Sequence, residues 1–466
     1  MPDRPSQPFD YRQFKRNAPR RQTSQRDQWS ELKPLDRQGL LERFSESDQT
    51  GRVARHILSN SQSVFVTGRA GTGKSTLLRA LKTALDGEVA IVAPTGLAAS
   101  NAGGATIHSF AGLRARYIDV QSERGKISKR LARRLRTLFV DEVSMVRADL
   151  LHGLSIALKE ARASDEPFGG VQVVYFGDML QLPPVVTEDL KRAISVKYGR
   201  PYWFACPDVK PDEMQYIELL QVYRQTDEKF IGALNRVRDG DVDAETMRYF
   251  NARTSTEKAV DGEVLVTCRK NEADIENSSR LRQLAGSSQS YRASITGEKQ
   301  FPEKVFPNDP DLVLKVGAQV LLLKNAQDKS YVNGTIGWVH ELEPDSVAVR
   351  LESGRIVQVY REVWEHVEYV FDETTQRVEA RAVAKYEQIP LALAYAMTIH
   401  KCQGQTLERV CVDLGRGAFA AGQLYVALSR CKAYEGLRLR RQIGENDLRV
   451  DPEALGYKDL FTRIDL

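Results

Sequence analysis

The sequence lacks three features that would each indicate a particular class of protein. It contains no apolar run close to the roughly 18 residues that a membrane-spanning helix requires, and no pattern typical of a signal peptide. Its five cysteines include no C-x-x-C pair, and its six histidines include no H-E-x-x-H motif. These absences argue against membrane association, a disulfide framework and structural zinc, and they favour a reducing compartment.

The net charge of +5 is small for 466 residues, but it is unevenly distributed. Residues 1–40 contain nine Lys and Arg against five Asp and Glu, and they are rich in Pro, Gln and Ser, so we expect a disordered basic tail. Residues 114–136 contain nine basic residues against two acidic ones, and the part from 128 to 136 has the pattern of an arginine-rich helix. Such a run is either a solvated surface or a contact for a polyanion, and the sequence leaves both open.

The strongest functional signal lies near residue 70. The apolar run 64–66 predicts a buried strand, residues 68–75 have the spacing G-x-x-x-x-G-K-S, and a helical run follows to about residue 85. In this context the backbone N–H groups of the loop and the helix N-terminus hold a β-phosphate, whereas a chance glycine-rich turn is the alternative. Lys74 is then expected to reach the β- and γ-phosphates, and Ser75 to place its hydroxyl on Mg²⁺.

Two later segments supply groups for nucleotide hydrolysis. The apolar strand predicted over 137–140 ends at two adjacent carboxylates. We expect Asp141 to hold Mg²⁺, directly or through water, and Glu142 to orient and deprotonate the attacking water. A further strand and loop over 171–184 carries Gln181, whose amide could contact the γ-phosphate.

Further polar residues have two interpretations each. The amide of Gln49, 19 residues before Gly68, could pair with adenine or could simply lie on a helix surface. Arg224 and Arg430 belong to the half without the phosphate loop and could reach a γ-phosphate across a cleft, although a single arginine more often forms a surface ion pair. The small and hydroxyl residues of the loop over 93–110 suit contact with a nucleic-acid backbone.

Seven blocks along the chain together resemble a known family. In order they are TGRAGTGKST, APTGLAASNAGGATIHSF, LFVDEVSMV, PFGGVQVVYFGDMLQLPPV, VYRQ, AYAMTIHKCQGQTL and GQLYVALSRCK. They resemble the superfamily-one, class-B helicases, and most closely the petite-integration-frequency (PIF) helicases related to RecD. The resemblance covers roughly residues 45–435.

The resemblance implies an α/β fold with two RecA-like P-loop NTPase domains, a small arm in the first and an SH3-like β-barrel insertion in the second. Short alternating strands between about 296 and 385, with hairpin signals at Asn333-Gly334 and Ser353-Gly354, independently favour an all-β insertion. The predicted divisions are the tail over 1–40, domain 1A over 41–215 with its arm at about 111–136, domain 2A over 216–295 and 386–466, and the insertion, domain 2B, over 296–385.

The resemblance also implies roles for individual residues. It implies that the metal ligands are Ser75 and Asp141. It implies that the catalytic residues are Lys74, Asp141, Glu142, Gln181, Arg224 and Arg430. Nucleotide contact falls to Gln49, Gly71, Thr72, Gly73, Lys74, Ser75, Thr76 and Gly404. Single-strand contact falls to Thr95, Thr106, His108, Ser109, Thr398, His400 and Lys401.

The implied activity is that of an ATP-dependent DNA helicase with ATP and Mg²⁺ as cofactors. It would translocate 5′ to 3′ on single-stranded DNA and unwind duplex, forked or structured DNA, including G-quadruplexes and RNA–DNA hybrids, in replication, repair or recombination. We expect a monomer that binds single strands and single-strand/duplex junctions, has no membrane partner, and lies with the nucleoid in a bacterial cytoplasm, or in a nucleus or mitochondrion if the source is eukaryotic. A P-loop phosphotransferase and a non-catalytic nucleic-acid binder are the alternatives. The arginines in the second half argue against the first, and the intact Lys74, Ser75, Asp141 and Glu142 argue against the second.

Overall fold

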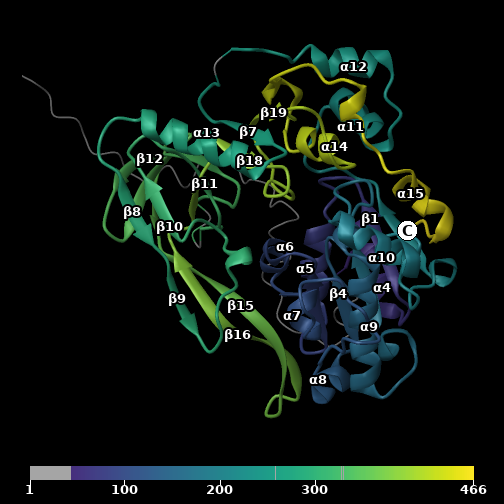
Figure 1. Cartoon of the computed structure of the whole chain (residues 1–466). Coiled ribbons are helices and arrows are strands. Elements are labelled where there is room, and N and C mark those ends of the chain that lie inside the picture. Colours follow the sequence, from purple (N-terminus) through teal and green to yellow (C-terminus); the bar gives the residue numbers. More distant parts are fainter. Residues whose placement is uncertain (1–43, 258, 327, 329) are drawn as a thin grey trace, which may run out of the picture.

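A computed structural model describes residues 44–466 except residues 258, 327 and 329, so the tail predicted over 1–40 lies outside the described residues. The described chain forms two α/β domains and a group of antiparallel sheets beside them (Figure 1). All five cysteines are buried free thiols. No helix among residues 44–466, the three gaps aside, is long and apolar enough to cross a membrane.

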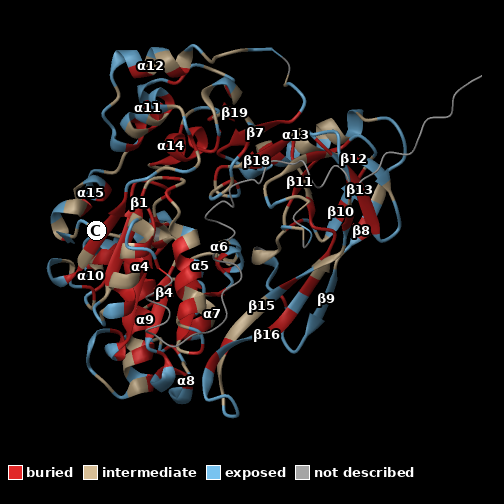
Figure 2. Ribbon diagram, turned by 180° about the vertical axis from the view of Figure 1, so that it is seen from behind, coloured by how far each residue is buried: buried red, intermediate tan, exposed pale blue. Residues whose placement is uncertain are grey.

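The first domain is built on a seven-stranded sheet with the order β21-β6-β1-β5-β4-β2-β3, in which neighbouring strands run parallel. Most of its central strands are continuous apolar runs because helices cover both faces of a parallel sheet. Buried residues are concentrated in this sheet and in the helices packed on it (Figure 2). Its strands are β1 (Val64–Gly68), β2 (Val89–Ala93), β3 (Ala105–Thr106), β4 (Thr137–Val140), β5 (Gln172–Phe176), β6 (Gln215–Leu219) and β21 (Thr462–Arg463). Its helices are α4 (Gln49–Ser59), α5 (Lys74–Ala84), α6 (Gly96–Ala102), α7 (Ile107–Ala111), α8 (Lys129–Arg134), α9 (Ala148–Arg162), α10 (Glu188–Tyr198) and α15 (Pro452–Leu455).

The second domain has a smaller parallel sheet with the order β18-β7-β19-β20. Two P-loop-type α/β units were predicted, and the α/β fold with two parallel sheets confirms that class. The strands are β7 (Glu263–Thr267), β18 (Ala396–Thr398), β19 (Arg409–Asp413) and β20 (Leu437–Leu439). The helices are α11 (Glu228–Asp239), α12 (Ala244–Asn251), α13 (Lys270–Gln283) and α14 (Gln423–Leu428).

The insertion is antiparallel, as predicted, but it is not a closed barrel. Its main sheet has the order β14-β13-β12-β11-β17, and in the described part of the chain β14 and β17 stay at opposite edges. Strands β15 and β16 pair with each other along their whole length, and β16 also pairs with β9, so these strands form a separate sheet and do not close the main one. The strands are β8 (Gln289–Arg292), β9 (Ser294–Gly297), β10 (Asp311–Leu314), β11 (Gln319–Leu322), β12 (Ile336–Leu342), β13 (Ser346–Leu351), β14 (Ile356–Tyr360), β15 (Glu362–Asp372), β16 (Arg377–Gln388) and β17 (Leu391–Leu393).

The last residues of the chain differ from the predicted division. Residues 216–295 and 386–466 were assigned to domain 2A, but β6, which continues to Leu219, pairs with β1 in the first sheet, and β21 pairs with β6. Tyr457 and Phe461 pack on Phe65 of β1, with ring centroids 5.8 and 5.7 Å from it. The apolar area that these rings bury in the first core explains why the chain returns there, and no block of the resemblance extends this far.

Candidate active site and nucleic-acid interface

The nucleotide residues meet because three parallel strands end at the same edge of the first sheet. β5 lies between β1 and β4, with Val66 opposite Phe176 and Val140 opposite Tyr175. The phosphate loop follows β1, the adjacent carboxylates follow β4, and the segment of Gln181 follows β5. This carboxyl edge is where ligands bind in parallel α/β sheets.

The phosphate loop has the geometry that its sequence predicts. Gly73 caps the N-terminus of α5 with a left-handed φ of 89°. The Lys74 ammonium is enclosed by the loop and donates to the carbonyl oxygens of Gly68 (2.5 Å) and Arg69 (3.0 Å). Burial lowers the pKa of Lys74, while Asp178 and Glu142 nearby act in the opposite direction. Phosphate oxygens would provide this half-buried cation with stronger acceptors than the two carbonyls.

The two adjacent carboxylates are half-buried beside this lysine. Burial, with the neighbouring Glu142 charge second, raises the pKa of Asp141 to about 7. Burial also raises the pKa of Glu142, whose backbone has a left-handed φ of 50° and whose N–H donates to Asp141 Oδ1 at 2.9 Å. A half-buried carboxyl pair of this kind is stabilised by a bound cation. The described residues hold no cluster of three His, Cys, Asp or Glu that could bind a metal alone, so Mg²⁺ here would depend on nucleotide phosphates for its other ligands.

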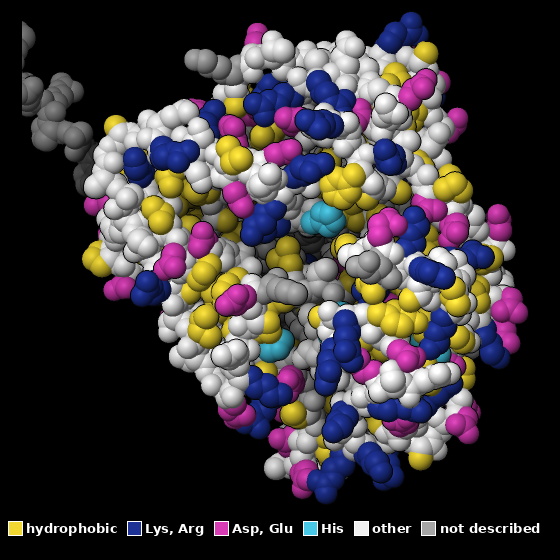
Figure 3. Space-filling model, in the orientation of Figure 1, with side chains coloured by type: hydrophobic (Ala, Val, Ile, Leu, Met, Phe, Trp, Pro, Cys, Tyr) yellow, Lys and Arg dark blue, Asp and Glu magenta, His cyan; other side chains and the backbone are white. Residues whose placement is uncertain are grey.

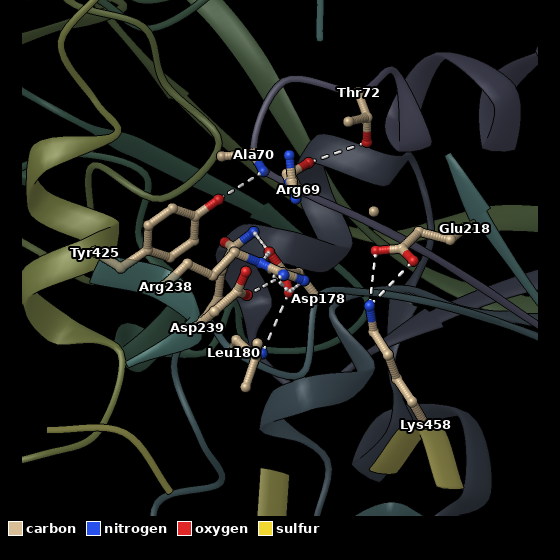
Figure 4. A network of polar contacts seen from close by, with 12 residues as sticks. Arg69, Ala70, Thr72, Asp178, Leu180, Glu218, Arg238, Asp239, Tyr425 and Lys458 are labelled. Carbon is tan, nitrogen blue, oxygen red and sulfur yellow. Dashed lines mark hydrogen bonds and ion pairs between the residues drawn. The ribbon is translucent and has the colours of Figure 1, made fainter. Parts of the chain in front are cut away.

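A buried ion pair joins the two domains beside this site (Figure 4). Asp178, which follows β5, accepts from Arg238 of α11 at 2.7 Å, and the two side chains are 0% and 1% exposed. Although burial alone would raise the pKa of Asp178, the Arg238 charge and hydrogen bonds lower it. The amide of Gln181 donates to the same carboxylate at 3.2 Å. The predicted γ-phosphate sensor is therefore fixed to a side chain that the second domain holds.

Replacing Arg238 with methionine should destabilise the protein strongly. The substitution leaves the Asp178 carboxylate buried without its cation, and breaking such a pair costs about 3–5 kcal/mol. Thermal and denaturant unfolding should show the loss, and it should be smaller in the double variant Arg238→Met/Asp178→Leu, because that variant removes both charges. The control is Arg236→Met on the same helix, where the ion pair with Asp243 is exposed. Equal shifts for the two single variants would contradict the prediction.

Arg224 lies directly against the phosphate loop. Gly71 has a φ of 82°, and a Cβ there would come within 2.5 Å of Arg224 Cβ, so only glycine permits this approach. The Arg224 guanidinium donates to the carbonyl oxygens of Gly404 (3.0 Å) and Ser429 (3.3 Å) in the second domain. It therefore lies where both domains contribute to the predicted nucleotide site.

Arg430 is packed inside the second domain. Its side chain is buried and donates to Val426 O at 2.8 Å and Ser429 Oγ at 2.8 Å. Its charge is one of the causes that lower the pKa of Glu142 against the larger effect of burial. The structure thus places Arg430 near Glu142, the carboxylate predicted to be catalytic, with its hydrogen bonds made to its own domain.

The predicted nucleotide contact Gln49 uses its side-chain amide for hydrogen bonds within the protein. Its amide donates to Glu218 O at 2.8 Å and accepts from Leu220 N at 3.0 Å, which ties α4 to the end of β6. Adenine would have to share or replace these bonds, so adenine contact stays a prediction. The other predicted nucleotide contacts on the phosphate loop and at the start of α5 lie together, namely Gly71, Thr72, Gly73, Ser75 and Thr76.

The predicted DNA contacts fall into two groups, one on each α/β domain. In the first domain, Thr95 follows β2 and Thr106 is the last residue of the neighbouring β3, and their hydroxyls accept from the helix N–H groups of Ala98 and Ser109. His108 lies one turn further on, and burial lowers its pKa. Its Nε2 is buried without a hydrogen-bond partner within the described residues.

In the second domain, Thr398 is the last residue of β18, and His400 and Lys401 follow it. Thr398 Oγ1 accepts from Lys401 N at 3.3 Å, and burial lowers the pKa of His400. In the space-filling view, Lys and Arg side chains border a hollow between the α/β domains and the insertion (Figure 3). The two predicted groups thus lie on separate domains, as they would if one strand contacted both.

The insertion covers part of this predicted interface. A Cβ at Gly96, the residue after Thr95, would lie 1.8 Å from Val305 Cγ1 of the insertion, so the two segments are in close contact. Tyr369 of β15 accepts from Ile91 N at 2.9 Å, and its ring lies edge-on to Phe110 at 5.8 Å. At the tip of the β15–β16 hairpin, Arg377 pairs with Asp86 at 3.3 Å. We call the contacts of Tyr369 and Arg377 with the first domain the hairpin clasp; Figure 1 shows the hairpin alongside that domain.

Sequence reasoning missed two residues that the site brings to the nucleotide groups. Arg238 gave no signal, because its partner lies 60 residues away in the other domain. Gln403 donates from its Nε2 to Glu142 Oε2 at 2.9 Å. It stands next to the predicted Gly404 in a quoted block, so the block indicated the region but not the residue.

The chain has been compared with known proteins. A family model described as PIF1-like helicase matches residues 48–248. The chain is 34% identical to an ATP-dependent DNA helicase Pif1 from Bdellovibrio bacteriovorus over 88% of this chain and 90% of that protein. It is also 34% identical to the human ATP-dependent DNA helicase PIF1, of which it spans 63%.

Solved structures give the same result. A Bacteroides Pif1 in complex with ADP-AlF4 has a TM-score of 0.82 and 32% identity over 89% of this chain and 96% of that one. A Bacteroides Pif1 bound to ssDNA has a TM-score of 0.64 and 33% identity over 88% of this chain and 95% of that one. With its quoted blocks in order and its relatives matched over most of its length, the chain belongs to the PIF1-like helicase family.

Proposed function

We propose that this protein is an ATP-dependent DNA helicase that hydrolyses ATP to move 5′ to 3′ along one DNA strand. One observation carries the proposal. The phosphate loop of the first domain contacts Arg224 and its Glu142 carboxylate accepts from Gln403 of the second domain, and each domain also carries part of the predicted strand contacts. A nucleotide bound at this junction can therefore change how the two halves of the strand interface are placed.

Each nucleotide residue has a task that its position supports. Lys74 would exchange its carbonyl partners for β- and γ-phosphate oxygens. Gln181 would contact the γ-phosphate while its amide is hydrogen-bonded to Asp178, so binding of the phosphate would affect the position of that carboxylate. Ser75 and Asp141 would hold Mg²⁺, which supplies positive charge to the phosphates when bound. Glu142 would orient the attacking water and accept its proton.

The energy needed for unwinding is modest beside that of nucleotide binding. Separating one base-pair step of DNA costs about 1.4 kcal/mol on average. A difference of this size in strand affinity between open and closed forms of the cleft is enough to favour a step, provided that ATP binds the closed form better. Arg224 can supply that preference, because it lies against the phosphate loop and donates to carbonyl oxygens of the second domain.

The DNA path must open before a strand can occupy it. The TM-score is 0.82 to the ADP-AlF4 complex and 0.64 to the ssDNA complex at nearly equal identity and coverage, so the whole structure is less similar to the latter. The contact of Val305 with Gly96 and the hairpin clasp lie over the first group of predicted DNA contacts. These facts support a release of the insertion from the first domain on strand binding.

Weakening the hairpin clasp should therefore strengthen single-strand binding. The double variant Tyr369→Ala/Arg377→Ala should lower the Kd for oligo(dT) by about 5–30-fold if the clasp contributes 1–2 kcal/mol to the covered form. Fluorescence anisotropy would measure it. The control is Arg381→Ala, on the same strand as Arg377 but paired with Glu298 inside the insertion at 2.6 Å. Unchanged or weaker binding by the double variant would contradict the release.

The finer substrate range is also part of the proposal. We expect binding to single-strand/duplex junctions and unwinding of forked DNA, G-quadruplexes and RNA–DNA hybrids by a monomer. The residues predicted to contact DNA are backbone-directed hydroxyls, imidazoles and a lysine, which suit a strand of any sequence. Because the substrate is DNA, we place the protein with the nucleoid of a bacterial cytoplasm, or in a nucleus or mitochondrion if the source is eukaryotic.

The test is ATP turnover with and without oligo(dT), together with displacement of a strand from duplexes that carry a 5′ or a 3′ single-stranded tail. We expect the oligonucleotide to stimulate turnover and only the 5′-tailed duplex to be unwound. An ATP turnover rate that is the same with and without DNA would refute the proposal that the protein is a helicase. Unwinding of the 3′-tailed duplex would refute the proposed 5′-to-3′ direction.

A further inference from the structure

A stiff turn of the second domain, residues 398–405, connects the predicted DNA contacts with the nucleotide site. Cys402 N donates to Thr398 O at 3.1 Å, and Gln405 N donates to Cys402 O at 3.0 Å. Thr398 Oγ1 accepts from Lys401 N as described above. These consecutive bonds leave the turn little freedom to bend, so a displacement at one end is passed to the other.

Gln403 lies at the nucleotide end of this turn. Its hydrogen bond to Glu142 crosses from the second domain to the first, and it reaches the carboxylate that is expected to act on the attacking water. A carboxylate can accept about four hydrogen bonds, so the amide leaves acceptor sites for water while it restricts the direction of the group. Glu142 has buried surroundings and a left-handed backbone, which restrict it further.

Both arginines predicted to act on the nucleotide contact the same turn. Arg224 donates to Gly404 O at 3.0 Å, and Arg430 makes longer contacts with Cys402 O (3.5 Å) and Gln405 O (3.4 Å). The turn is therefore bonded to three groups of the nucleotide site, of which only Glu142 belongs to the first domain.

We propose that Gln403 is a positioning residue that makes ATP hydrolysis depend on DNA. A strand held by Thr398, His400 and Lys401 displaces the turn, and the Gln403 amide then directs the Glu142 carboxylate toward the attacking water. The inference rests on the proposed function, because it needs DNA at residues 398–401. A displacement of about 1 Å is sufficient, since misplacement on this scale changes rates by as much as about 10²-fold.

The test compares the full-length wild type with Gln403→Ala and Gln403→Asn. The first removes the amide, and the second keeps an amide but shortens its reach by one methylene. The matched control is Gln405→Ala, which removes a second amide from the same turn. Each protein would be assayed for kcat and KM for ATP, with and without a 20-nucleotide oligo(dT), for the Kd of that oligonucleotide and for its melting temperature.

We expect the ratio of kcat with DNA to kcat without DNA to fall at least tenfold in both Gln403 variants, with KM for ATP and the oligonucleotide Kd within about twofold of wild type. The Gln405→Ala ratio should match that of the wild type. A residue of purely structural importance would instead lower both rates in proportion or lower the melting temperature. An unchanged ratio in Gln403→Ala, or a fall explained by weaker DNA binding or unfolding, would overturn the inference while leaving the helicase assignment intact. A wild type without DNA stimulation would overturn both.

Discussion

Replacing Lys74 with alanine should lower the kcat for ATP on the order of 10³-fold and abolish strand displacement. Lys74 is a half-buried cation of the phosphate loop, and its present acceptors are two loop carbonyls that provide no negative charge of their own. Removing the ammonium takes away a donor that acts on the γ-phosphate as its charge develops. Phosphate release in the presence of saturating oligo(dT) would measure the loss.

Two further variants test whether the loss of ATP turnover in Lys74→Ala is specific to the phosphate contacts. Lys82→Ala removes a lysine from the same helix, where it donates to Gly103 O at 2.7 Å, and it should keep wild-type turnover. Glu142→Gln should lose turnover by about 10²–10⁴-fold yet still bind nucleotide, because it removes the base and leaves the phosphate contacts. Residual unwinding by Lys74→Ala at the wild-type rate would rule out this loop as the motor.

The second large effect is expected from Arg224→Ala, with kcat lowered on the order of 10³-fold or more. Arg224 is held against Gly71 and reaches carbonyls of the second domain, so its guanidinium lies where a γ-phosphate would meet both domains. Arg224→Lys should not restore activity, because lysine keeps the charge but lacks the planar fork. Steady-state turnover and nucleotide affinity should be measured together, since we expect kcat to fall more than affinity.

The control for Arg224 is Arg440→Ala, an exposed arginine of the second domain that pairs with Asp413 at 3.2 Å. It should behave as wild type. If Arg224→Ala hydrolyses ATP at the wild-type rate, the arginine holds the domains together without acting on the nucleotide.

The elements that carry the phosphate chemistry were predictable because each is local in sequence. The run 64–66 lies in β1, the run 137–140 is β4, and the glycine-rich loop between β1 and α5 follows from the conformations that only glycine adopts easily. The turn at Ser353-Gly354 likewise joins β13 to β14, since Gly354 has a φ of 81°.

The parts that escaped prediction depend on which surfaces meet in space. Nothing near Arg238 indicates Asp178, and nothing near Gln403 indicates Glu142, because each pair forms only when the two domains come together. The same holds for Tyr369 on Phe110, since β15 has the alternating pattern of any half-buried strand. Gln49 shows the converse case: its spacing suggested a ligand contact, and the structure gives its amide two backbone partners.

The polypeptide passes between the two α/β domains twice, once after β6 and again before α15, whose following strand rejoins the first sheet. With one covalent connection the domains could rotate about any axis through it, whereas two separate connections favour rotation about the axis that passes through both. Rotation of the domains about that axis leaves both connections in place, whereas rotation about any other axis stretches or bends them. Two connections therefore restrict the relative movements of the two domains more than one connection would.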